Sequence, residues 1–185
     1  MSEINFIKKY EKADAAKKID LICKHYHNFV KIIDGYAEGL CYVIYNDRIS
    51  KHKSDIYELG VRVQTSGMHS DVTADTAISK VEIKRAVISC DFSGNELEGL
   101  AKKELYRKKA YLLRNMRADY ELFNKQLNVL EEEESRIFLG YINKKLTLHD
   151  IADEEGIQPE SAMKRVIRIK RRLKDHMLLF FEGTI

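Results

Sequence analysis

Hydrophobic residues recur at intervals of three and four along most of the chain, which is the period of an amphipathic helix. The spacing predicts helices over about residues 19–44, 73–89 and 96–130, followed by three helices between residues 130 and 177. One proline and nine glycines in 185 residues leave few sites for turns. The pattern therefore predicts an all-α fold, with Gly35 and Gly39 as the places where the first helix breaks or kinks.

The predicted helices group into regions along the chain. The segment IYELGVRVQTSGMHSD that begins at Ile56 has no helical period and contains a Thr-Ser-Gly cluster, which is typical of a linker. We therefore expect an N-terminal helical region over 1–55, a linker over 56–72, a middle region with a long connecting helix over 73–127, and a C-terminal domain over 128–185.

The long connecting helix carries a seam of large apolar residues spaced like a short heptad repeat. The seam consists of Leu113, Met116, Tyr120, Phe123, Leu127 and Leu130. It predicts either a homodimer through a short coiled coil or packing against the N-terminal helices of the same chain. Fewer than three heptads favour the second alternative, since coiled coils usually sustain three or four.

The C-terminal region has strong signals for helix ends. Thr147 is placed to cap a helix, with Asp150 three residues later completing a capping box. Gly156 is suited to end that helix, and Pro159 suits the first position of the next. The sequence predicts two helices joined by a short glycine turn.

The last helix has one apolar and one cationic face. Its expected buried stripe consists of Ala162, Val166, Ile169, Leu173, Met177 and Phe180. Seven of the eleven residues from Lys164 to Lys174 are basic and none is acidic. A basic helix after a capped helix and a glycine turn is the design of the helix-turn-helix, whose second helix enters the DNA major groove.

Position along this helix suggests which residues do what on DNA. Its N-terminal residues would reach base edges, and those one to two turns later would reach phosphates. The candidates for base contact are Gln158, Glu160, Ser161, Lys164 and Arg165. The candidates for phosphate contact are Arg168, Arg171 and Arg172.

Two stretches also resemble a known family. The segments LTLHDIA at 146–152 and GIQPESAMKRV at 156–166 are similar to region 4 of the sigma-70 family. The upstream segment VRVQTSG at 61–67 resembles sigma-like regulators of phages and mobile elements, related to the ArpU and RinA late-gene activators. The resemblance implies promoter DNA binding by residues 158–172 and contact with RNA polymerase through the helix that begins with Glu131, Glu132, Glu133 and Glu134. Nothing in residues 1–125 resembles sigma region 2, so an accessory regulator is favoured over a complete sigma factor.

Composition and motif content argue against several other classes of protein. The net charge is only +3, and no apolar run approaches the roughly 18–20 residues of a membrane-spanning helix. Three cysteines and an N-terminus without a signal-peptide pattern indicate a reducing, cytoplasmic location. Cys23, His25 and His27 lack the second cluster that a zinc site needs, and no phosphate-binding loop is present. We expect no metal, no cofactor and no enzymatic activity.

Two alternatives to the regulator stay open. A phage DNA-packaging subunit of the small-terminase kind also uses a helix-turn-helix, but assembles as a ring. A polymerase-binding or sigma-binding protein would instead act through Glu131 to Glu134 without binding DNA.

Overall fold

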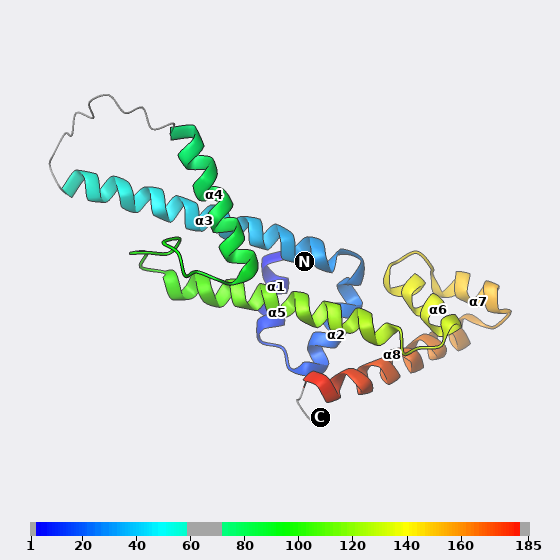
Figure 1. Cartoon of the computed structure of the whole chain (residues 1–185). Helices are drawn as coiled ribbons and strands as arrows, with labels where there is room; N and C mark the ends of the chain where they lie inside the picture. Colours follow the sequence, from blue (N-terminus) through cyan, green and yellow to red (C-terminus); the bar gives the residue numbers. More distant parts are fainter. Residues whose placement is uncertain (1–2, 59–71, 182–185) are drawn as a thin grey trace. The chain divides into compact units, whose positions relative to one another are not determined.

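A computed structural model describes residues 3–58 and 72–181 of the chain, with side chains described within 5–51 and 76–181. Helices and their joints make up these residues, with no strand among them (Figure 1). The elements are α1 (Glu3–Glu11), α2 (Ala15–His25), the 3-10 turn η1 (Tyr26–Asn28), α3 (Phe29–Glu58), α4 (Val72–Ser89), α5 (Lys103–Leu127), α6 (Glu132–Ile142), α7 (Leu148–Glu155) and α8 (Pro159–Phe181). The predicted all-α class is confirmed. None of the described helices has the length and apolar character needed to cross a membrane.

The chain divides into two compact units that differ from the four regions predicted above. Unit 1 combines residues 1–32 with 117–185, and unit 2 comprises residues 33–116. The N-terminal helices belong to unit 1 because α2 packs against α6 and α8. The unit boundaries therefore fall inside α3 and α5. Of the expected linker, residues 56–58 end α3 and Val72 opens α4, while the rest lies outside the described residues.

Aromatic rings from three helices form part of the core of unit 1. The Phe29 ring stacks on Tyr120 with centroids 5.3 Å apart and meets Phe6 edge-on at 5.7 Å. The Tyr10 hydroxyl donates a hydrogen bond to Asp119 Oδ2 at 2.9 Å. These contacts join α1, the start of α3 and the last part of α5.

The apolar seam of α5 is covered within the monomer. Leu113, Met116, Phe123, Leu127 and Leu130 are buried, and Tyr120 is half-buried. In unit 1 the seam packs on the N-terminal helices, as the second alternative predicted, with Tyr26 lying against Tyr120 and Phe123. The stripe proposed for a homodimer is therefore not an exposed surface.

The break in the first predicted helix lies elsewhere than expected. Helix α3 continues through Gly35 and Gly39, whereas the chain departs from α-helix at Tyr26–Asn28. There the Tyr26 hydroxyl donates to Asn124 Oδ1 at 2.6 Å. A tertiary contact with α5 accompanies this break, and local glycine propensity alone does not locate it.

Unit 2 contains α4, which confirms the helix predicted over residues 73–89, and the first part of α5, which begins later than expected. Residues 96–102 form turns in which Leu97 and Leu100 are buried, and α5 begins at Lys103 instead of Glu96. Gly99 has a left-handed backbone with φ of +67°, which interrupts any helix running through this segment. Side-chain contacts inside the unit include Lys84 with Glu38 at 2.5 Å and the Tyr106 hydroxyl with Asp47.

Candidate nucleic-acid interface

Helices α6 and α7 are joined by a tight turn in which the Leu146 side chain packs closely on Gly140. A Cβ on Gly140 would come within 2.4 Å of Leu146 Cδ1, so a larger residue there would force the leucine side chain to move. The amide groups of Lys145 and Leu146 donate to the Gly140 carbonyl at 2.9 and 3.1 Å. This close turn places α7 beside α6.

Helix α7 has the caps that its sequence predicts. The Thr147 hydroxyl accepts from the Asp150 amide at 3.2 Å, and Asp150 Oδ2 accepts from the Thr147 amide at 2.7 Å, which completes the capping box. The hydrogen bond from the Thr147 amide holds the pKa of Asp150 below its usual range. At the other end, Gly156 is left-handed with φ of +64°, and Pro159 opens α8 two residues after Ile157.

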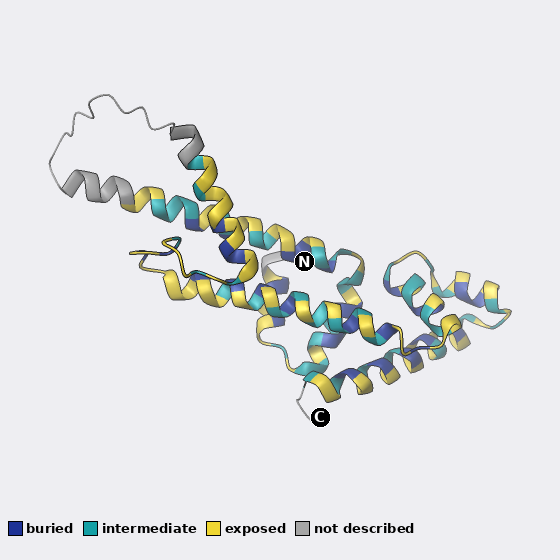
Figure 2. Cartoon of the chain, viewed as in Figure 1, coloured by how far each residue is buried: buried dark blue, intermediate teal, exposed yellow. Residues whose placement is uncertain are grey.

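Helix α8 buries almost the whole stripe that its periodicity predicts. Ala162, Val166, Ile169, Leu173 and Met177 are at most 5 % exposed, and Figure 2 shows buried positions recurring along the helix. Phe180, assigned to the same stripe, is 43 % exposed because it lies at the last turn of the helix. On α6 the core residues are Ile137, Phe138 and Ile142, whereas Tyr141 is exposed.

The face of α8 opposite the buried stripe is cationic and exposed. Lys164, Arg168 and Arg171 lie within an arc of about 60° when each residue is turned by about 100°. All three are exposed and make no ion pair with any described residue. Gln158, Glu160 and Ser161 are also exposed, near the start of the helix. This outer face presents three positive side chains to solvent.

Arg165, predicted to read bases, is instead bound by two carboxylates of unit 1. Its guanidinium lies 2.5 Å from Glu155 Oε2 on α7 and 3.0 Å from Glu133 Oε1 on α6. Burial works against the charged guanidinium, but the hydrogen bonds that it donates to these carboxylates outweigh that effect and raise the pKa of Arg165. Arg136 contacts Glu154 at 2.7 Å and Glu155 at 3.1 Å. Arg165 therefore connects three helices.

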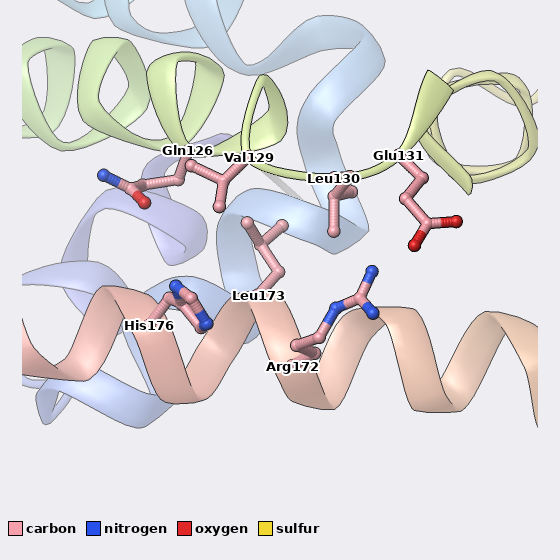
Figure 3. A pocket seen from close by; sticks show the side chains of 7 residues that line it. All are labelled: Gln126, Val129, Leu130, Glu131, Arg172, Leu173 and His176. Atoms are coloured by element: carbon pink, nitrogen blue, oxygen red, sulfur yellow. The ribbon is translucent and has the colours of Figure 1, made fainter. Parts of the chain in front are cut away.

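Arg172, predicted to contact phosphates, is also paired inside the unit. Its guanidinium pairs with Glu134 of α6. Figure 3 shows its side chain rising from α8 toward the segment that carries Leu130 and Glu131. It lines a small pocket of about 220 Å³ between α8 and this segment. The carboxylates that pair with Arg165 and Arg172 come from elements that a helical projection does not include, so the sequence pattern did not reveal these ion pairs.

The other flank of α8 is neutralised by one carboxylate that the sequence analysis did not single out. Asp20 of α2 lies 2.7 Å from Lys170 Nζ and 2.7 Å from Lys174 Nζ. Partial burial would raise the pKa of Asp20, but the hydrogen bonds from the two lysines outweigh it and lower the pKa. Asp20 is one of several acidic residues in the N-terminal helices, so no local signal marks it as a partner of α8.

The acidic residues that open α6 divide into two kinds. Glu133 and Glu134 pair with Arg165 and Arg172, whereas Glu131 and Glu132 are exposed and make no ion pair with a described residue. The hydrogen bond from Arg165 lowers the pKa of Glu133. Two of the four glutamates predicted to contact polymerase are thus ion-paired inside unit 1.

Other candidate chemistry lies outside this interface. Cys23 is buried, and burial raises the pKa of its thiol to about 12, which leaves it uncharged at neutral pH. The described residues contain no group of three histidine, cysteine or acidic side chains placed to hold a metal ion.

Comparison with protein-family models gave no match to this chain. Searches of curated proteins and of solved structures also found no match.

Proposed function

We propose that the chain is a sequence-specific DNA-binding transcriptional regulator that acts with RNA polymerase, and that α7 and α8 form its helix-turn-helix. The exposed cationic face of α8 is the observation that carries this proposal. Lys164, Arg168 and Arg171 project from a helix whose opposite face is buried, and no described carboxylate neutralises them. Such a face suits the phosphates and base edges of a DNA groove.

The proposed roles follow the surroundings of each side chain. Arg168 and Arg171 capture the DNA backbone, and Lys164 lies nearer the helix start, where side chains reach bases. Gln158 and Ser161 supply hydrogen-bonding groups beside Lys164. Arg165 and Arg172 position α8 against α6 and α7, so they serve the interface indirectly.

A binding titration tests the proposal. We expect the double variant Arg168→Gln/Arg171→Gln to bind fluorescent duplex DNA about a hundredfold more weakly, because the two lost charged contacts are together worth roughly 3 kcal/mol. The slope of log affinity against log salt should fall by about 2. The matched control is Lys103→Gln/Lys108→Gln, which removes the same charge from exposed lysines of α5. Equal behaviour of the two variants, or no DNA binding by the unmodified protein, would refute the proposal.

A test of the role of Lys164 requires a DNA site that the protein binds in preference to random DNA. With a site enriched from random duplexes, Lys164→Ala should reduce the preference for that site over random DNA. Arg171→Ala should weaken binding to both DNAs alike. Equal losses on both DNAs for the two variants would refute this division of roles.

Glu131 and Glu132 are the residues proposed to meet polymerase, since Glu133 and Glu134 already have partners. The alternative function is that of a protein that binds polymerase but not DNA. Such a protein would not need the cationic face of α8, so the variant Arg168→Gln/Arg171→Gln would keep its full activity.

A further inference from the structure

A second group of lysines lies outside the helix-turn-helix, in a groove between α1 and α2. The groove has a volume of about 520 Å³. Five lysines line it, three near α1 and two from α2: Lys8, Lys9, Lys12, Lys17 and Lys24. The one carboxylate that lines it is Asp20. All of these residues belong to unit 1, as does α8.

Three of the five lysines of this groove have no carboxylate partner among the described residues. Asp20 is already shared by Lys170 and Lys174 of α8, and Asp14, next to the groove, pairs with Lys17 at 2.8 Å. Lys8, Lys12 and Lys24 are exposed and make no ion pair with a described residue. A groove with at least three unneutralised ammonium groups attracts a polyanion.

We infer that this groove is a second contact site for the sugar-phosphate backbone of the DNA that α8 binds. The inference rests on the proposed function. Two observations favour a DNA strand as the occupant. Lysine ammonium groups act as point charges that bind phosphates without a fixed orientation. Asp20 also links the groove to the flank of α8, so both basic surfaces belong to one compact unit.

The groove adds positive charge to the proposed DNA interface but does not distinguish one DNA sequence from another. Its exposed lysines would contribute to affinity for every duplex, whereas the start of α8 would distinguish sequences. The chain would therefore hold DNA at two places on unit 1, with discrimination at only one of them.

The test compares two triple variants of the full chain that lose equal charge. Lys8→Gln/Lys12→Gln/Lys24→Gln removes the exposed groove lysines, and Lys103→Gln/Lys108→Gln/Lys125→Gln removes exposed lysines of α5. Affinity for a fluorescent duplex is measured at several salt concentrations. We expect the groove variant to lower the salt slope by about 2 to 3, at roughly 0.9 per phosphate contact, and the control to leave it unchanged. Far-ultraviolet circular dichroism checks that both variants keep their helix content.

The outcomes separate this inference from the proposed function. If the unmodified protein binds DNA and the groove variant keeps its salt slope, the groove inference is wrong and the proposed function stands. If both triple variants lose equally, the effect is one of net charge and the inference is again overturned. If the groove variant keeps DNA binding but loses binding to polyglutamate, the occupant is an acidic protein segment. Failure of the unmodified protein to bind any duplex would overturn both proposals.

Discussion

The seven cations between Lys164 and Lys174 share one helix and nevertheless fall into two groups. Arg165 and Arg172 on one flank, and Lys170 and Lys174 on the other, are bound by carboxylates of neighbouring helices. Lys164, Arg168 and Arg171, on the face between these flanks, have no such partner among the described residues. A run of like charge therefore serves two purposes in α8: the flanking cations attach the helix to its unit, and the cations of the outer face stay available for a ligand.

The largest effect on folding is expected from removing a flank cation. Arg165→Ala leaves the carboxylates of Glu133 and Glu155 without their shared partner, and the Glu155 side chain is only 13 % exposed. We expect the free energy of unfolding to fall by about 2 kcal/mol, because the partly buried Glu155 loses the closer of its two cationic partners and keeps only Arg136. Chemical denaturation followed by circular dichroism measures this change.

The matched control for Arg165 lies on the outer face of the same helix. Arg168→Ala should change the free energy of unfolding by less than about 0.5 kcal/mol, as an exposed substitution does. If Arg165→Ala were as stable as Arg168→Ala, the two groups of cations would not differ in the way described above.

A smaller effect is expected from converting paired cations into unpaired ones. Asp20→Asn releases Lys170 and Lys174 from their common carboxylate. Stability should fall by only about 0.5 to 1 kcal/mol because these groups are partly exposed. DNA affinity should rise a few-fold at low salt, since the unit gains one positive charge. The control Asp175→Asn, on the exposed part of α8, adds the same charge without releasing a lysine. Weaker DNA binding by Asp20→Asn would contradict the division of the α8 cations into paired flank residues and unpaired outer-face residues.

The smallest expected effect is a dependence of stability on pH. The pKa values of Asp20 and Glu133 are lowered by their cationic partners, so their contribution is fully present above the unfolded values of about 4. That contribution is lost as the pH falls through the lower folded values. Glu133→Gln should therefore reduce the loss of stability below about pH 4, measured by thermal unfolding at a series of pH values.

Asp119 provides a control of opposite sign for this titration. Burial raises its pKa, so its contribution is present below the unfolded value and is lost as the pH rises through the folded value. Asp119→Asn keeps an oxygen to accept from Tyr10 and removes the titrating group. It should reduce the loss of stability as the pH rises above about 4 and leave the profile below about pH 4 unchanged. The same pH profile for both variants would contradict these assignments.

Several features of the fold were predicted correctly from neighbouring residues. The capping box of Thr147 and Asp150, the left-handed Gly156 and the start of α8 at Pro159 depend on contacts within three or four positions. Two features that depend on distant partners were not predicted. The break at Tyr26–Asn28 lies where Tyr26 contacts Asn124, and the grouping of the N-terminal helices with α8 depends on packing between distant segments.

The candidate nucleic-acid interface also combines features that the sequence predicted with features that it did not. Periodicity identified the buried stripe of α8 and placed the cations on its other faces, because helical geometry orients side chains every 100°. It did not identify which cations stay exposed. Glu155 and Asp20 lie 10 and 154 residues from the cations that they bind, Arg165 and Lys174.

The amino-acid sequence by itself determined the helical class, the joints around α7 and the amphipathic character of α8. These features depend on periodicity and on hydrogen bonds between near neighbours, both of which are present in a linear pattern. Only the tertiary structure decided that Lys164, Arg168 and Arg171 face solvent while the flanking cations hold the helix in place. The physical reason is that a charge is neutralised by whatever carboxylate the fold brings within about 3 Å, and a linear pattern carries no such distances.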